Sequence, residues 1–305
     1  MNRPDSLDRT LKFMAEANDK PQQIVVVDQS QDADVQMQNQ KVLDSYKDVI
    51  PSLVYEHQQA KSLTKARNLG LTKATNEILA FTDDDIDVNT DTFTNVAFIM
   101  SEQKIAMIAG IDEYTQQSST DIGYILGTKS YRNRKIGHVT HSMLGRYPDN
   151  IKIQTETQWA QGYFFVVRKS LMKQWGTKWD ENLTSYAYAE DLDFSYGYYK
   201  KAHAEGLRCV IDPRVKVKHL ATLEYRIPGA NSIYMYVINR AYLSHKHKMG
   251  VFGHIESNWC DFWRLVERIV KKQQSAEFFH AIYCKYKYRS EIYSGKLDYE
   301  KFMGK

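Results

Sequence analysis

The sequence predicts an α/β fold, in which a mostly parallel sheet is flanked by helices. The first observation is a set of short runs, at residues 23–28, 77–82 and 105–110, that are too apolar for strands facing water. The second is that segments with a helical spacing of apolar residues lie between these runs. The third is that two runs end in carboxylates, at Asp28 and at Asp83. In such sheets, ligands bind at the carboxyl ends of the strands.

Strands and helices alternate along the first two thirds of the chain. Pro4 favours a helix start, Gly206 favours a helix end, and Pro213 favours a break in a strand. Helices are expected at residues 4–17, 34–48, 62–74, 91–101, 122–131 and 190–205, and one further helix is expected to begin at 168–171. Strands are expected at residues 23–28, 53–55, 77–82, 105–110, 163–167, 208–211 and 215–219. Beyond residue 220 we expect a C-terminal helical extension with aromatic-rich helices at 232–247 and 255–272.

Length, charge and cysteine content exclude several classes of protein. The 305 residues suffice for one large or two small domains, and a net charge of +4 is too small to argue for nucleic acid binding. The three cysteines, Cys209, Cys260 and Cys284, lie far apart, as expected for reduced thiols in a cytoplasm. No apolar run approaches the length of a membrane-spanning helix. We therefore expect a cytoplasmic protein, soluble or peripheral at the inner face of the membrane.

Three adjacent acids, Asp83, Asp84 and Asp85, follow the strand expected at residues 77–82. Adjacent carboxylates repel one another and resist burial, so a strand that ends in this way needs a cation or ligand donors at its edge. Oxygen ligands of this kind suit Mg²⁺ or Mn²⁺, which also bridge to substrate phosphates. The alternative for the triplet alone is an acidic turn or a helix cap.

A second acid cluster and a histidine lie at the ends of other expected elements. Glu190, Asp191 and Asp193 stand at the start of a helix, where its dipole favours negative charge, and His219 ends a short strand. The polar segment 112–156 is a long excursion of the kind that lines sites in compact enzymes. An active site assembled from several strand ends would require such a distribution.

Over residues 2–220 the chain resembles the family-2 glycosyltransferases of the GT-A fold. The resemblance rests on the order and spacing of several motifs: Asn2-Arg3-Pro4, Val27-Asp28-Gln29-Ser30, Ala66-Arg67-Asn68-Leu69-Gly70, Phe81 to Asp85, Gly162 to Arg168, Trp179-Asp180-Glu181, Glu190 to Asp193, and Val217-Lys218-His219. It implies transfer of a sugar, with inversion, from a nucleotide-diphosphate donor to an acceptor hydroxyl, with Mn²⁺ or Mg²⁺ as cofactor. It also implies a role in polysaccharide or glycolipid synthesis, with a saccharide or a lipid-linked molecule as acceptor.

The resemblance implies a role for each matched residue. The residues that would contact the donor nucleotide sugar are Asp28, Gln29, Arg67, Asp83 and Asp84. Asp85 and His219 would hold the metal, and Asp191 would be the catalytic base. The acceptor would contact Trp159, Gln161, Gly162 and Glu190. Gln29 departs from the family, which more often has an acid there, although an amide can still hydrogen-bond a pyrimidine.

The resemblance also implies a domain organisation. Residues 1–222 would form the GT-A domain, with a nucleotide-sugar-binding half (1–110) and an acceptor half (111–222), and residues 223–305 would form the helical extension. In this family a central strand precedes the first helix, whereas this sequence begins inside that helix. We expect either that the natural reading frame starts upstream or that the product is a compromised enzyme.

Other interpretations remain open at this point. A sugar nucleotidyltransferase would need a glycine-rich loop near its start, and the sequence has none there. A glycoside hydrolase would use a pair of carboxylates but would leave residues 83–85 unexplained. A protein that binds a nucleotide sugar without turnover would fit a sheet that lacks its first strand. Asp191 alone could be a helix cap, and His219 a hydrogen-bonded core residue. For the aromatic stripe that includes Trp259 we favour a packed helix face over a lipid anchor. We favour solvated positions for two histidine pairs, His138 with His141 and His245 with His247, and for three arginines that could touch an anionic acceptor, Arg132, Arg134 and Arg146.

Overall fold

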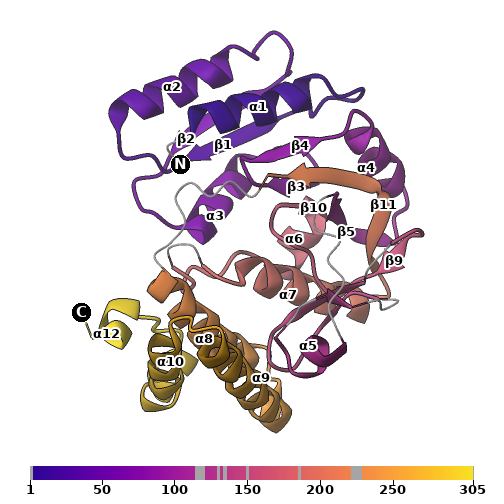
Figure 1. Ribbon diagram of the computed structural model, residues 1–305. Coiled ribbons are helices and arrows are strands. Elements are labelled where there is room, and N and C mark those ends of the chain that lie inside the picture. The colour runs from indigo at the N-terminus through magenta and orange to yellow at the C-terminus, as the bar shows by residue number, and fades with distance from the viewer. Residues whose placement is uncertain are drawn as a thin grey trace.

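Two β-sheets with helices packed around them form the upper part of the molecule in Figure 1, and a bundle of helices forms the lower part. The computed structural model describes residues 3–113, 121–128, 131–132, 136–148, 151–184, 187–220 and 229–304. Asn2 and Arg134, which the sequence analysis named, lie outside these residues.

The first sheet has two parallel strands, β1 (Ile24–Asp28) and β2 (Leu53–His57), with Ile24 opposite Leu53. Three helices pack around it: α1 (Pro4–Ala15), α2 (Ala33–Asp44) and α3 (Leu63–Lys73). Leu7 and Leu11 of α1 and Leu43 of α2 are buried together against this sheet. The helices and strands expected in this part of the chain are therefore confirmed.

The second sheet has the order β3 (Ile78–Thr82), β10 (Phe164–Arg168), β5 (Ile105–Asp112), β11 (Arg208–His219) and β4 (Ile86–Val88), and β9 (Thr155–Glu156) pairs with β11. Strands β5 and β11 are parallel, whereas β10 and β4 run antiparallel to their neighbours. The expected α/β fold with flanking helices is therefore confirmed, although this sheet contains more antiparallel pairs than expected. Phe164 and Val166 belong to one core cluster and Phe165 and Val167 to another, because successive side chains point to opposite faces of a strand. Helices α4 (Thr92–Met100), α6 (Lys169–Trp175) and α7 (Glu190–Ala204) pack around this sheet.

A cavity of about 1540 Å³ is lined by every residue of β1 and every residue of β3. Among the described residues, β1 pairs with β2 alone and β3 with β10 alone, so each strand has one edge without a partner strand.

Two local predictions were wrong. Pro213 does not end a strand, because β11 continues through it with a register shift between Ile211 and Lys216, and such a bulge accommodates a proline. The helix expected over 122–131 is the shorter α5 (Asp121–Ile125). Gly127 follows it with a φ of 73°, and a Cβ there would lie 2.2 Å from Cys260 Sγ. The excursion continues as a small sheet of β6 (Tyr131–Arg132), β8 (Gly145–Pro148) and β7 (His138–Val139).

The C-terminal bundle is built around α8 (Gly229–Lys246), which α9 (Gly250–Val270), α10 (Ser275–Lys287), α11 (Arg289–Tyr293) and α12 (Tyr299–Met303) contact. Asp261 of α9 forms two ion pairs: its carboxylate lies 2.9 Å from Arg240 Nη1 of α8 and 2.6 Å from Lys285 Nζ of α10. All three side chains are buried. This charge cluster joins three helices. Over the described residues, no helix is both long and apolar enough to cross a bilayer.

Candidate active site

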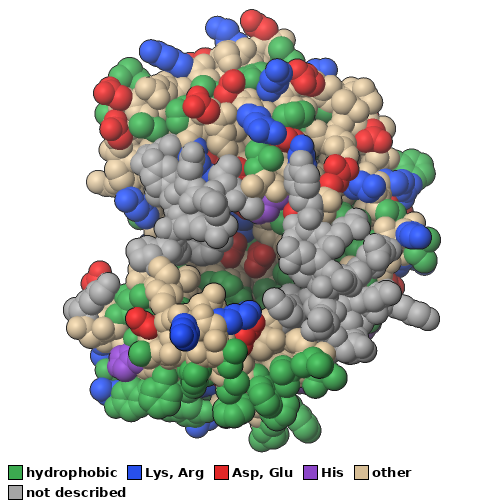
Figure 2. Space-filling model, in the orientation of Figure 1, with side chains coloured by type: hydrophobic (Ala, Val, Ile, Leu, Met, Phe, Trp, Pro, Cys, Tyr) green, Lys and Arg blue, Asp and Glu red, His purple; other side chains and the backbone are tan. Residues whose placement is uncertain are grey.

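The predicted site residues meet around the cavity beside β1 and β3. Strand β1 ends at Asp28, the acid triplet follows β3, His219 ends β11, and Asp191 lies in the first turn of α7. All of these residues line the same cavity. Figure 2 shows carboxylate side chains and a histidine in the hollow between the upper and lower parts of the molecule.

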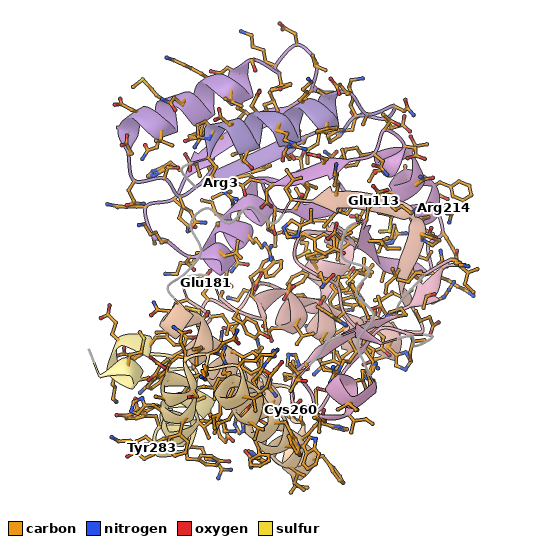
Figure 3. The ribbon with its side chains drawn as sticks, in the orientation of Figure 1. Arg3, Glu113, Glu181, Arg214, Cys260 and Tyr283 are labelled. Atoms are coloured by element: carbon orange, nitrogen blue, oxygen red, sulfur yellow. The ribbon has the colours of Figure 1, made fainter. Side chains whose placement is uncertain are left out.

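Asp83, Asp85 and His219 bring one ligand atom each within 4.8 Å of one another. Asp85 Oδ1 lies 3.3 Å from His219 Nε2, and Asp85 Oδ2 lies 3.4 Å from Arg3 Nη1. Arg3 also contacts Asp84, and it is labelled in Figure 3 at the start of α1. Burial raises the pKa of Asp83 to about 6; Arg67 opposes this effect and the charge on Asp85 adds to it. The crowding predicted for the triplet is therefore present in the folded protein.

His219 is held by two residues that sequence reasoning missed. Its ring stacks on Tyr163 with the centroids 5.3 Å apart, and its backbone N–H donates to Asp112 Oδ1 at 3.1 Å. Burial alone would lower the pKa of His219, but the hydrogen bond and charge of Asp85 outweigh burial and raise it. Asp112 ends the apolar strand β5 as Asp28 ends β1, so the sequence did contain a signal for it.

Arg67 of α3 connects the acid triplet to the start of α7. Its guanidinium donates to Glu190 Oε1 at 2.9 Å, to Asp83 Oδ1 at 3.2 Å and to the Gly162 carbonyl at 3.0 Å. The same group lies 4.4 Å from the centroid of the buried Trp179 ring. One buried cation therefore holds three segments that are far apart in the sequence.

Glu190 and Asp191 are presented by a turn with unusual backbone conformation. Ala187 and Ala189 have φ values of 55° and 67°, a region that residues with a side chain rarely adopt. Asp191 Oδ2 accepts from Gly162 N–H at 2.8 Å, and Asp191 Oδ1 accepts from Leu192 N–H at 2.7 Å. Burial raises the pKa of both carboxyls, and the charge on Asp191 raises that of Glu190 further.

The segment predicted to shape an acceptor pocket packs beside Asp191. Trp159 stacks near Tyr147 at 4.6 Å between centroids, and Gln161 N–H donates to the Tyr147 hydroxyl at 3.1 Å. A Cβ on Gly162 would lie 3.1 Å from Arg67 Nη2 and 3.2 Å from Asp191 Cβ. Gly162 thus permits the close approach of the two charged side chains.

The carboxylate of Asp28 is saturated by protein donors. It accepts from the backbone N–H and hydroxyl of Ser30, from Asn39 Nδ2 and from the Tyr55 hydroxyl, at 2.6–2.8 Å. Burial would raise the pKa of Asp28, but these hydrogen bonds together lower it. The neighbouring Gln29 lines the cavity, and its Oε1 accepts from Ser62 N–H at 2.7 Å.

Other candidates are placed differently from their predictions. Arg146 is 4% exposed and lies over the Tyr124 ring at 4.4 Å, so the solvated position predicted for it is wrong. His247 is also buried, with Nε2 2.8 Å from Asp193 Oδ1. The side chains of Arg132 and Arg134 lie outside the described part of the chain. Within the ranges that the structure describes, no third ligand joins His138 with His141, or His245 with His247, in a group that could hold a metal.

The donor set at the triplet fits a divalent cation. Two carboxylates and an imidazole suit Mn²⁺, and their ligand atoms lie within 4.8 Å of one another. The fit rests on Asp83, Asp85 and His219.

The sheet, with the acid triplet at its ligand-binding edge, defines a glycosyltransferase of the GT-A class. A family model described as glycosyl transferase family 2 matches residues 1–176, and the chain belongs to that family. The comparison with curated proteins found no match.

Solved structures with the same fold include three glycosyltransferases of low sequence identity. The mannosyltransferase PcManGT from Pyrobaculum calidifontis, in complex with GDP-Man and Mn²⁺, is 16% identical, with a TM-score of 0.52 over 81% of this chain and 61% of that one. S. aureus TarS 1-349 in complex with UDP-GlcNAc is 15% identical, with a TM-score of 0.56 over 93% of this chain and 78% of that one. GalNAc-T7 with UDP, GalNAc and Mn²⁺ is 16% identical, with a TM-score of 0.55 over 95% of this chain and 55% of that one.

Proposed function

We propose that the protein transfers a sugar, a hexose or hexose derivative, from a nucleotide-diphosphate donor to an acceptor hydroxyl with inversion at the anomeric carbon. One observation carries the proposal. The metal-type group of Asp83, Asp85 and His219 and the separate carboxylate of Asp191 line one cavity. Inverting transfer requires such a division, with stabilisation of the departing diphosphate at one place and a base for the acceptor proton at another.

Asp191 is the base in this proposal. Its carboxylate takes the proton of the acceptor hydroxyl while the acceptor oxygen bonds to the anomeric carbon, and the bond from that carbon to the diphosphate breaks with its electron pair. Hydrogen bonds from Gly162 and Leu192 hold the carboxylate in one orientation, so little reorganisation accompanies the reaction.

Donor binding falls to the residues around the triplet. Asp83 and Asp84 bind the nucleotide sugar, Asp85 and His219 hold Mn²⁺ or Mg²⁺, and Arg67 keeps Asp83 in place. When bound, the cation neutralises charge on the diphosphate oxygens, which supports its departure. Asp28 and Gln29 meet the nucleotide from the other end of the cavity, where hydrogen bonds from Ser30 and Tyr55 fix Asp28 and one from Ser62 fixes Gln29.

The acceptor lies on the Asp191 side, against Trp159, Gln161, Gly162 and Glu190. We propose a saccharide or a lipid-linked acceptor, as in polysaccharide or glycolipid synthesis, and no nucleic acid partner. Residues 1–222 form the transferase domain, with its donor half at 1–110 and its acceptor half at 111–222, and residues 223–305 form the extension. A cytoplasmic location with peripheral contact at the inner face of the membrane completes the proposal.

Donor hydrolysis provides the test. We expect the protein to release free nucleoside diphosphate from a nucleotide sugar in the presence of Mn²⁺ or Mg²⁺. Replacement of the base in Asp191→Asn is expected to lower this rate by roughly 10² to 10⁴ while donor affinity, measured by calorimetry, is retained. Asp180→Asn, outside the cavity lining, is the control for nonspecific loss of a partly buried, hydrogen-bonded acid.

The alternatives predict other outcomes. Binding of nucleotide sugar without release would identify a compromised, nucleotide-sugar-binding protein. Release that depends on added pyrophosphate and yields nucleoside triphosphate would identify a sugar nucleotidyltransferase. Either result would overturn the proposed transfer reaction.

A further inference from the structure

Helix α9 is packed with its polar side inward and its apolar side outward. The residues it buries are Gly253, Ser257, Cys260 and Asp261. Seven of its large apolar residues are exposed instead, with exposed fractions between 46% and 76%: Val251, Phe252, Ile255, Trp259, Phe262, Ile269 and Val270. Their spacing of three or four residues places them on one face. The packed face predicted from the sequence is therefore wrong for most of this stripe.

The apolar face extends beyond α9 on both sides. On α10, Phe279, Tyr283 and Tyr286 are also more than half exposed, and the Tyr286 hydroxyl donates to Asn258 of α9. On the other side, Trp259 Nε1–H donates to the Ile125 carbonyl of α5 at 3.1 Å, next to the exposed side chains of Ile122 and Ile125. We call this the α9 surface. Figure 2 shows hydrophobic side chains gathered over the lower edge of the molecule, and Figure 3 shows Tyr283 at its outer margin.

The charges near the α9 surface are predominantly positive. Residues 245–289 contain nine Lys and Arg residues against four Asp and Glu residues. Asp261 pairs with Arg240 and Lys285, and Glu267 pairs with Arg264 and Lys271. Outside these pairs, six Lys and Arg residues of this range stand against two Glu residues. Exposed Lys272 follows Val270 closely in sequence, and the Lys287 ammonium lies 5.5 Å from the centroid of the exposed Tyr283 ring.

We infer that the α9 surface lies on a membrane containing anionic lipids, with α9 in the plane of the interface. An outward apolar stripe with tryptophan and phenylalanine, bordered by lysines, matches the chemistry of a lipid headgroup and acyl boundary. A two-fold contact with a second copy would instead place two surfaces of the same positive charge against each other, which charge repulsion disfavours. This inference rests on the membrane contact of the proposed function and names the surface that makes it.

Vesicle cosedimentation tests the inference with the full chain. We expect binding to phosphatidylcholine vesicles that contain phosphatidylglycerol, at least tenfold weaker binding to pure phosphatidylcholine, and weaker binding at high salt. The double variant Phe262→Ser/Ile269→Ser is expected to lose at least tenfold in partitioning. The matched control, Phe98→Ser/Ile153→Ser, removes a Phe and an Ile that are somewhat more exposed and lie outside the α9 surface, and it is expected to bind like the unaltered protein.

Two further measurements keep the result interpretable. Thermal unfolding of both double variants verifies that they fold, and donor hydrolysis in solution separates failure of the membrane inference from failure of the transferase proposal. The inference is overturned if neither vesicle binds the protein, or if both double variants lose binding equally. It is also overturned if sedimentation shows a dimer that only the α9 variant dissociates, with no vesicle binding.

Discussion

The contacts of Arg67 give the most demanding prediction about the site. Arg67→Met keeps an unbranched side chain over Trp179 but removes the charge that faces Glu190 and Asp83. Removing one partner of a buried ion pair costs about 3 to 5 kcal/mol of folding free energy, because the other charge is left unpaired. The side chain of Glu190 is 9% exposed, whereas that of Asp83 is 35% exposed and is screened by water. We therefore assign most of the loss to Glu190 and expect about 3 kcal/mol.

The sign of the pH dependence follows from Glu190. Its pKa is already raised by burial, and loss of Arg67 raises it further. A carboxyl whose pKa is higher in the folded than in the unfolded state makes its full contribution to stability at a pH below the unfolded pKa. This contribution is lost as the pH rises from the unfolded toward the folded pKa. The destabilisation by Arg67→Met should therefore be larger at pH 8 than at pH 5.

Urea unfolding of a double-mutant cycle measures the effect. Glu190→Gln removes the charge that Arg67→Met leaves unpaired, so the double variant should recover a large part of the lost stability at pH 8. Additive losses in Arg67→Met/Glu190→Gln, or a loss independent of pH, would refute the reasoning.

Three other predictions concern single positions. Gly162→Ala is expected to destabilise the protein by about 1 to 3 kcal/mol, because the added Cβ overpacks against Arg67 and Asp191. Gly197→Ala inside α7 has room for its Cβ and should stabilise the helix. Thermal unfolding compares the two variants, and equal shifts in Tm would contradict the account. Asp261→Ala leaves Arg240 and Lys285 buried without their ion-pair partner and should cost about 3 to 5 kcal/mol in urea unfolding. Glu291→Ala breaks a more exposed pair with Lys301 and should cost much less; similar losses would be inconsistent with a buried cluster. Burial raises the pKa of Asp191 above its usual value of 3.8, so kcat/KM should fall on acidification with a midpoint above that value, and a profile flat down to that pH would rule out Asp191 as the base.

The strands and their polar ends were predictable because each strand is a short apolar run that stops at an acid, even though only β5 is buried along its whole length and β1 and β3 line the cavity. The runs at β1, β3 and β5 are apolar throughout, and each stops at an acid that the structure places at an edge of a sheet. Strand direction left no such mark, so the antiparallel β10 and β4 were not distinguished from parallel strands. The bulge at Pro213 was missed because a proline reads equally well as a strand end.

The site was predicted less completely because its organisation depends on contacts between distant segments. Nothing local to Arg67 indicates that it reaches Asp83, Gly162 and Glu190 together, since this depends on how α3, β3 and α7 pack. Arg146 looked like one of several surface arginines, yet tertiary packing buried it beside Tyr124. The stripe on α9 shows the reverse case. Its periodicity was evident, but periodicity does not say whether an apolar face meets the protein or something outside it.

Diffraction from a crystal soaked with Mn²⁺ and a nucleotide sugar tests the central claim most directly. The anomalous signal of manganese locates the ion, and the electron density locates the sugar. We predict a peak in contact with Asp85 and His219 and with the diphosphate, the nucleotide sugar against Asp83, and the anomeric carbon facing Asp191. A peak elsewhere, or a nucleotide sugar bound outside the cavity that these residues share, would contradict the account.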